Sequence, residues 1–223
     1  MKFDLRARLM AEFLGSAFLV AAVIGSGIMG ERLAGGNVAI ALLANTIATG
    51  AALLALILTL GPISGAHLNP AVTISDAIEG GISWGEAAAY IVVQCAGGIA
   101  GAIVAHLMFG LRWYSISQHS RHGWALGLSE FVATFGLLSV IWGCSRLRPE
   151  AVPLAVASYI TAAYWFTAST SFANPAVTIA RALSDTFAGI SPVDVPLFIA
   201  AQVTGGLCAT MVFRRVAPRS ATS

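Results

Sequence analysis

Two asparagines, Asn69 and Asn174, each open a copy of the same hexapeptide, Asn-Pro-Ala-Val-Thr-Ile. An asparagine side chain caps the N-terminus of a helix well, and a proline at the first helical position loses no hydrogen bond. The two copies therefore predict helices that begin at Pro70 and Pro175. The side-chain amides and the free backbone N–H groups at these helix starts would offer hydrogen-bond donors to an oxygen atom.

The two predicted helices are short. They cover Pro70–Ile78 and Pro175–Leu183, nine residues each. At about 1.5 Å per residue each reaches ~14 Å, about half of a ~30 Å hydrocarbon core. We therefore expect two half-helices that enter a membrane from opposite faces and meet at their N-termini. The unwound chain before each one must be buried in protein or line water.

The rest of the chain has the composition of a membrane protein. Of its 223 residues, 57% are hydrophobic and 10% are charged, and the mean hydropathy is +0.83. This composition excludes an ordinary soluble domain, and a net charge of +2 gives no reason to expect nucleic-acid binding. We predict an all-α membrane protein with six transmembrane helices and two re-entrant half-helices. The six predicted spans are Leu9–Ile28, Val38–Leu60, Ala87–Phe109, Ala125–Cys144, Ala151–Ala168 and Val195–Phe213.

The chain is an internal duplication. The matching stretches are AEFLGSAFLV (11–20) with SEFVATFGLL (129–138), and QCAGGIAGA (94–102) with QVTGGLCAT (202–210). With three spans in each half, the second copy must insert upside down relative to the first. We expect one channel domain over residues 1–223, made of inverted repeats at about 1–110 and 123–216. Such repeats place a solute pathway near the membrane midplane.

Basic residues predict the orientation. Six spans put both termini on one side, together with Lys2, Arg6, Arg8, Arg146, Arg148, Arg214, Arg215 and Arg219. The opposite side has Arg32, Arg112 and Arg121. The positive-inside rule then predicts a multi-pass protein of the inner (plasma) membrane with both termini in the cytoplasm. We expect the first helix to be retained and not cleaved as a signal peptide, because Glu12 interrupts its apolar run.

Two helix N-termini at the midplane would repel cations and turn the oxygen of a water or polyol toward the asparagines, which interrupts a proton-conducting chain. The pattern therefore predicts a passage for small neutral solutes. The alternative that each motif only begins a buried amphipathic helix does not account for two copies whose flanking sequences also match. An enzyme would need a nucleophile–base pair or clustered metal ligands, which we do not find. A structural membrane protein with a closed pore remains the alternative from a different class.

The chain resembles the aquaporin and aquaglyceroporin superfamily over essentially its whole length. The resemblance is carried by SGAHLNPAVT (64–73), FANPAVT (172–178), the glutamates of AEF and SEF, and Gln94 and Gln202 with their following glycines. It implies one pore per subunit, a homotetramer in the lipid bilayer, and no cofactor. The implied pore residues are Asn69, Pro70, Ala71, Asn174, Pro175, Ala176 and His67. The resemblance also implies that Glu12 and Glu130 are buried and bonded to the re-entrant loops.

The chain departs from this family at Val177. The family usually carries arginine directly after the second Asn-Pro-Ala, at the narrowest point near the extracellular mouth. The family's spacing places the other filter positions at Thr49, Ala162 and Ser171, or at Thr49, Ala163 and Phe172 if the loop is one residue shorter. Without the rigid guanidinium donors the opening would be wider and uncharged. The alternative is that Val177 only repeats Val72 of the first motif and that selectivity is set elsewhere.

A wide, mildly polar opening should admit glycerol-sized solutes as well as water. Bacterial relatives associated with arsenic resistance resemble this pattern, so undissociated arsenite, a neutral trihydroxy molecule, is the leading expected cargo. Methylated or organic arsenicals are plausible extensions. A water-selective channel or a glycerol facilitator is the alternative, although the Arg-Asp that usually follows the second motif of glycerol facilitators is missing.

Three further features have weaker predictions. Arg181 is four residues after Val177 and either replaces the missing charge or, as we favour, pairs with Asp185 at i+4. His119 and His122 have no third ligand nearby, so we expect no metal site in their loop, which we expect to cap the outer vestibule. We expect Cys95, Cys144 and Cys208 to be small packing residues.

Overall fold

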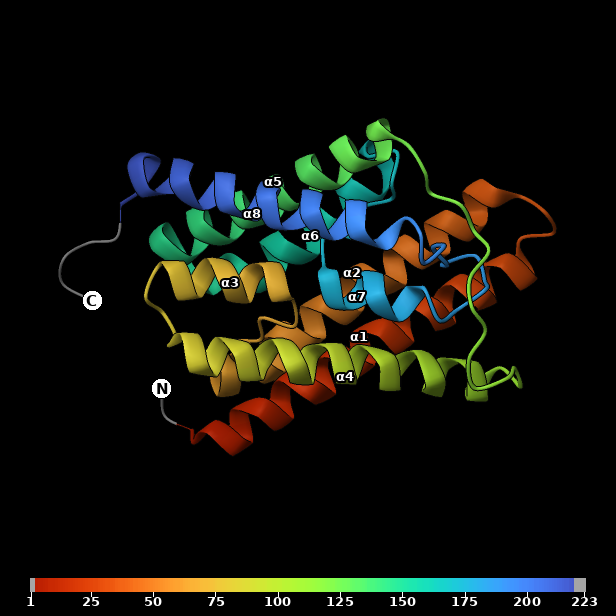
Figure 1. Ribbon diagram of the computed structural model, residues 1–223, viewed down its shortest axis with the longest axis horizontal. Helices are drawn as coiled ribbons and strands as arrows, with labels where there is room; N and C mark the ends of the chain where they lie inside the picture. Colours follow the sequence, from red (N-terminus) through yellow and green to blue (C-terminus); the bar gives the residue numbers. More distant parts are fainter. Residues whose placement is uncertain (1–2, 219–223) are drawn as a thin grey trace.

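The computed structural model describes residues 3–218, and every regular element in this range is a helix (Figure 1). The long helices are α1 (Leu5–Leu33), α2 (Val38–Ser64), α4 (Trp84–Met108), α5 (Trp124–Leu147), α6 (Val152–Phe166) and α8 (Val195–Val216). The short ones are α3 (Pro70–Ile78), α7 (Pro175–Arg181) and a 3₁₀ turn, η1 (Pro149–Ala151). Lys2 and Arg219, which the orientation prediction used, lie outside the described residues.

Each of the six predicted spans is a helix, so the predicted fold class is confirmed. Five of them, α1, α2, α4, α5 and α8, are long and apolar enough to cross a membrane. Helix α6 has 15 residues, or roughly 22 Å at about 1.5 Å per residue. It is shorter than the predicted span Ala151–Ala168. Ala151 belongs to the preceding 3₁₀ turn η1, and the helix ends at Phe166.

Glycines allow the long helices to pack in equivalent pairs. Helix α1 packs on α4 in the first half of the chain, and α5 packs on α8 in the second. A Cβ added at Gly101 of α4 would overlap the carbonyl oxygen of Ala17 in α1, and one added at Gly205 of α8 would overlap that of Phe131 in α5. Small residues at such crossings let the helix backbones touch, which is the main source of packing energy between helices in lipid.

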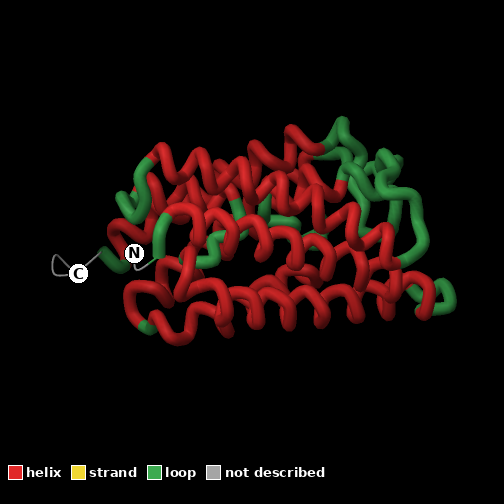
Figure 2. The backbone as a smooth tube through the Cα atoms, turned by 90° about the horizontal axis from the view of Figure 1, so that it is seen from below, coloured by secondary structure: helices red, strands yellow, loops and turns green. Residues whose placement is uncertain are grey.

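The half-helices α3 and α7 lie in opposite halves of the molecule, α3 in the half that holds both termini (Figure 1). Helix α3 ends at the predicted residue, Ile78. Helix α7 ends at Arg181, two residues before the predicted Leu183, because the carbonyls of the next two residues bind a neighbouring loop. The carbonyls of Ala182 and Leu183 accept the backbone N–H groups of Ser117 and Ser115. Loop segments run between the helices at this depth (Figure 2).

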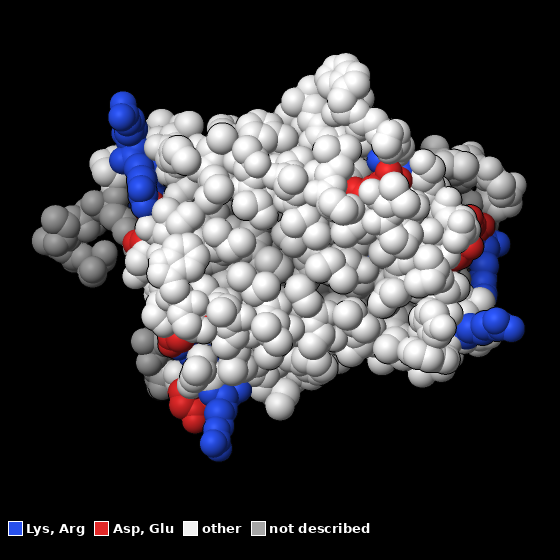
Figure 3. Space-filling view, viewed as in Figure 1, with Lys and Arg blue, Asp and Glu red and all other residues white. Residues whose placement is uncertain are grey.

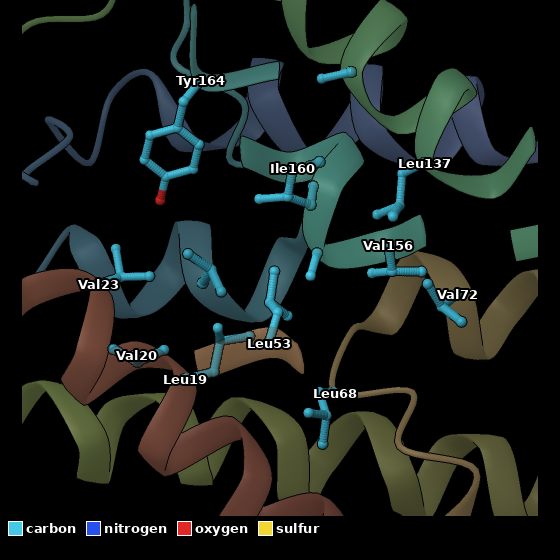
Figure 4. Packing of buried hydrophobic residues seen from close by; sticks show 14 of the residues in the cluster. Leu19, Val20, Val23, Leu53, Leu68, Val72, Leu137, Val156, Ile160 and Tyr164 are labelled. Atoms are coloured by element: carbon cyan, nitrogen blue, oxygen red, sulfur yellow. The ribbon is translucent and has the colours of Figure 1, made fainter. Parts of the chain in front are cut away.

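On the face shown in Figure 3, charged side chains gather toward the two ends of the molecule and leave the waist between them uncharged. The exposed apolar side chains of the long helices include Phe18, Ile47, Val92, Leu128 and Met211. The largest buried cluster lies where α1, α2, α5 and α6 surround the half-helices (Figure 4). An apolar waist of this kind matches the hydrocarbon layer of a bilayer.

We predict that Gly101→Ala lowers the stability of the protein in detergent, because the new methyl group forces α1 and α4 apart. Overpacking costs about 1–3 kcal/mol, and each kcal/mol shifts the melting temperature of a chain this size by about 2–4 °C. The control is Gly85→Ala, whose added Cβ meets no atom within 4 Å. Size-exclusion chromatography after heating measures both. Equal melting of the two variants would show that close contact at Gly101 is unimportant.

Candidate functional site

A cavity of ≈780 Å³ lies between the helices, and residues from both ends of the molecule line it. Its wall includes Ala217 next to the end of α8, where the termini lie, and Tyr164 and Arg181 toward the opposite end. Both motif asparagines, Asn69 and Asn174, are on the wall between these ends. The elements that meet at the cavity are therefore the two half-helices and the loops that lead into them.

Each asparagine is fixed by the loop of the other half. Asn69 Nδ2 donates to the Ala173 carbonyl at 2.7 Å, and Asn174 Nδ2 donates to the Leu68 carbonyl at 2.8 Å. Their Oδ1 atoms cap their own half-helices by accepting backbone N–H groups, that of Ala71 for Asn69. Because a primary amide has two N–H groups, each asparagine keeps one donor beyond its bond to the opposite loop. The two amides thus present oriented donors and no negative charge to the cavity.

The loops before the half-helices have an uncommon backbone. Ala66 and Leu68 in the first loop have φ of 46° and 49°, and Thr170, Ser171 and Ala173 in the second have 63°, 51° and 48°. These are left-handed conformations of residues that carry a Cβ, which persist only where the surroundings enforce them.

The first loop is enforced by Glu12, which is fully buried in α1. Its Oε1 accepts the backbone N–H of His67 at 3.0 Å, and its Oε2 accepts that of Leu68 at 2.7 Å. The hydroxyl of Ser64 and the amide of Gln94 also donate to this carboxylate, at 2.6 and 2.8 Å. The carboxylate thus satisfies unwound backbone that lipid could not satisfy.

The second loop has the same arrangement around Glu130 of α5, also fully buried. Its two oxygens accept the backbone N–H groups of Phe172 at 2.9 Å and Ala173 at 2.8 Å. Gln202 donates to the carboxylate at 2.6 Å and to the Thr178 hydroxyl of α7 at 2.9 Å. Both glutamates therefore position loops and are not placed to transfer protons to a substrate.

The structure places most of the predicted filter positions on the cavity wall. They are Thr49, Ser171, Phe172 and Val177, and the wall also includes His67. His67 Nδ1 lies 3.2 Å from the Thr73 hydroxyl, and its Nε2 lies 3.6 Å from Asp76 Oδ2. The two alternatives for the loop position, Ser171 and Phe172, thus both border the cavity.

The predicted position Ala162 is wrong for α6. Ala162 lines a separate shallow depression beside Gly50 and Trp165, and the alternative Ala163 does not line the cavity either. The wall residues of α6 are Val156, Ile160 and Tyr164. They are spaced by four, so they share one face of the helix, whereas Ala162 lies on another because each residue turns the helix by about 100°.

The structure shows a wall residue that counting from the motifs missed, Tyr164. Its hydroxyl donates to the Thr49 hydroxyl oxygen at 3.2 Å. An aromatic ring and a second hydroxyl therefore accompany Thr49 at this end of the cavity. The spacing of Val156, Ile160 and Tyr164 along α6 is the sequence signal that would have found it.

The expected pairing of Arg181 with Asp185 is also wrong. Arg181 Nε donates to the Ala188 carbonyl, and the guanidinium carbon lies 3.4 Å from the centre of the Phe172 ring. Asp185 Oδ1 instead accepts the backbone N–H of Gln118 at 2.9 Å. The local i+4 spacing was misleading because a carbonyl seven residues along the chain lies closer to the guanidinium.

The loop of residues 110–123 is bonded to the segment that follows α7. Its Arg121 donates from Nε to the Gly189 carbonyl at 2.8 Å and lies 4.9 Å from the centre of the Phe172 ring. Burial lowers the pKa of Arg121 to about 10, so it remains positively charged at neutral pH. Burial and the neighbouring Arg121 and Arg181 also lower the pKa of His119.

In the part of the chain that the structure describes, neither a cluster of metal-ligating side chains nor a cysteine lies on the cavity wall. Within residues 3–218, no group of three or more His, Cys, Asp or Glu side chains could hold a metal ion. His122 instead pairs with Asp194 at 3.1 Å. The three cysteines, Cys95, Cys144 and Cys208, are free and half-buried, and none of them lines the cavity.

Known proteins share the fold and much of the sequence. The family model described as Major intrinsic protein matches residues 1–148 and 145–222. The chain is 53% identical over 213 residues to "Aquaglyceroporin AqpS" of Rhizobium meliloti (strain 1021), which covers 96% of this chain and 91% of that protein. It is 38% identical over 144 residues to "Aquaporin NIP1-4" of Oryza sativa subsp. japonica, which covers 63% of this chain and 51% of that protein.

A solved structure has the same fold at low sequence identity. The X-ray structure of the aquaglyceroporin from Plasmodium falciparum superposes with a TM-score of 0.73 at 19% identity. The match covers 96% of this chain and 97% of that one. At this identity the likeness concerns the fold alone.

We predict that Glu12→Gln destabilises the protein and reduces solute flux, because glutamine has one acceptor oxygen where the loop supplies two backbone donors. A buried N–H without a partner costs about 1–3 kcal/mol. The matched control is Glu150→Gln, at an exposed position of η1. Thermal unfolding in detergent and vesicle swelling measure the two effects. If both variants behaved like the wild type, Glu12 would not be what holds the loop.

Proposed function

The chain belongs to the major intrinsic protein family, whose members are channels and not enzymes, and we propose that it passes undissociated arsenite and related metalloid hydroxides. Glycerol and water accompany these solutes, and methylated or organic arsenicals extend the range. A multi-pass membrane channel for small neutral solutes is what the family and the fold support directly. The choice among solutes is the proposal.

The observation that carries the proposal is Val177 on the cavity wall. It is the residue that directly follows the second Asn-Pro-Ala, where the family usually has arginine. A valine offers no donor and no charge, and it is much shorter than arginine. The passage beside it is therefore wider and less polar than a filter built on arginine.

The chemistry of arsenite fits the rest of the wall. Undissociated arsenite carries three hydroxyl groups and no charge, like glycerol. The remaining N–H groups of Asn69 and Asn174 and the hydroxyl of Thr49 provide partners for these oxygens. Apolar wall residues such as Leu53 and Ile160 suit the methyl group of a methylated arsenical.

Two other functions are weaker. A water-selective channel would need a narrow, strongly polar filter, which Val177 argues against. A structural membrane protein would not need a cavity of ≈780 Å³ whose wall extends from the end of α8 to Arg181. The relative named as an aquaglyceroporin favours a glycerol-sized solute over water alone.

The membrane placement follows from charge and from family resemblance. We place the chain in the inner (plasma) membrane as a homotetramer, with both termini in the cytoplasm. The exposed arginines support this orientation. Arg6 in the first turn of α1, Arg148 after α5, and Arg214 and Arg215 in the last turn of α8 belong to the helix ends near the termini. Arg32 in the last turn of α1 and Arg112 after α4 belong to the opposite helix ends.

We predict that Val177→Arg abolishes arsenite and glycerol flux and keeps water flux, because the guanidinium narrows the cavity and holds its donors rigidly. Stopped-flow light scattering of proteoliposomes measures all three, and a tenfold or larger loss is expected for a difference of about 1.4 kcal/mol or more. The control is Val177→Leu, which adds volume but no charge. Undiminished arsenite flux in the arginine variant, or a wild type that passes only water, contradicts the proposed solutes.

A further inference from the structure

The wall that lacks an arginine at position 177 has one at position 181, a single helical turn further along α7. We propose that Arg181 is the filter cation of this channel, and that with Phe172 and Tyr164 it excludes protons and metal cations and donates N–H bonds to the hydroxyl oxygens of neutral solutes. The second role rests on the proposed function, whereas the exclusion of cations can be tested without it.

The position of Arg181 follows from helix geometry. Residues four apart lie on the same face of a helix, and four residues advance about 6 Å along its axis. Arg181 therefore follows Val177 on the cavity wall and lies further from the half-helix start at Pro175. A solute that enters from this end meets the guanidinium before it meets Val177.

The guanidinium is held in place. It is only 2% exposed, its Nε donates to the Ala188 carbonyl, and it stacks 3.4 Å from the centre of the Phe172 ring. A stacked arginine with a backbone bond on one nitrogen has little freedom left. It therefore differs from a flexible side chain that reaches toward water, and it can act as a fixed electrostatic element of the wall.

Arg181 keeps donors that no residue uses. Its Nη1 is buried and has no hydrogen-bond partner within the described part of the chain. Buried polar groups are rarely left unpaired in native proteins, and those that are need an explanation. A donor held beside a solute pathway is explained by a passing oxygen atom, whether of a hydroxylated solute or of water.

The positive charge here is not neutralised. Among residues 3–218, neither Arg181 nor the nearby Arg121 forms a salt bridge. The oxygens of the buried carboxylate Glu130 are already bonded to the loop before α7 and to Gln202. A fixed cation in the wall, with Arg121 nearby and no paired carboxylate, repels any further cation.

The test compares proton flux in proteoliposomes that contain a pH-sensitive dye. We expect Arg181→Gln to raise proton flux roughly tenfold or more, because it removes a unit charge from the wall of the cavity. Arg181→Lys should keep the low proton flux of the wild type, because lysine keeps the positive charge. The double variant Arg181→Gln, Val177→Arg should also have a low proton flux, because it places a positive charge at position 177, one helical turn from position 181.

The same set separates an electrostatic role from a structural one. If Arg181 only held the loop through Ala188, the Arg181→Lys variant would pass protons as fast as Arg181→Gln. Adding Val177→Arg to Arg181→Gln would then not lower the proton flux. Either of these results overturns the proposal, as does an Arg181→Gln variant that is as tight as the wild type. Should Arg181→Gln fail to fold, Arg181→Met takes its place, because methionine fills the same space without a charge, and it is expected to raise proton flux in the same way.

Solute flux in the same vesicles keeps the two proposals apart. A wild type that passes only water contradicts the proposed solutes, while a proton leak confined to the uncharged variants still supports the filter cation. Conversely, arsenite flux with no change of proton flux in Arg181→Gln supports the solutes and overturns the filter cation. Size-exclusion chromatography and thermal unfolding of each variant in detergent confirm that the channel is folded.

Discussion

Unwound backbone inside a hydrocarbon layer must find all its hydrogen bonds within the protein, and this structure meets that demand with two buried carboxylates. Glu12 and Glu130 each accept two successive backbone N–H groups of a loop that no helix could satisfy. The left-handed residues of these loops, such as Leu68 and Ala173, persist because their N–H groups are held in this way. Everything at the centre of the molecule is positioned by these bonds.

The carboxylates act on the site through the asparagines. The carbonyls that accept from Asn69 and Asn174 belong to Ala173 and Leu68, whose own N–H groups bind Glu130 and Glu12. Each half of the chain therefore orients the donor of the other half. Close packing of α1 on α4 and of α5 on α8 keeps each glutamate at the depth of its loop. The same few hydrogen bonds thus hold the loops and orient the donors of both asparagines.

The sequence predicted the features that depend on local or periodic signals. The caps at Asn69 and Asn174, the helix starts and the six spans follow from residue type and apolar length. The missed features depend on contacts between distant segments. Helix α7 ends early because the carbonyls of the two residues after it bind a loop 65 or more residues earlier in the chain. The wall residue of α6 is Tyr164 and not the predicted Ala162, because a count from the motifs ignored which face of α6 lines the cavity. The partner of Arg181 is a backbone carbonyl, which no side-chain pattern reveals.

A single arginine beside the second motif would limit the size of the solute and its charge at one point. In this chain the two tasks are assigned to neighbouring turns of α7, with Val177 leaving room and Arg181 supplying the proposed charge. Because Coulomb forces act over several ångströms whereas steric exclusion acts only at contact, the charge can move by one turn without losing its effect. The passage can then widen for a bulky neutral solute while it still repels cations. This separation accounts physically for an arginine that is buried, stacked on a ring and left with unused donors.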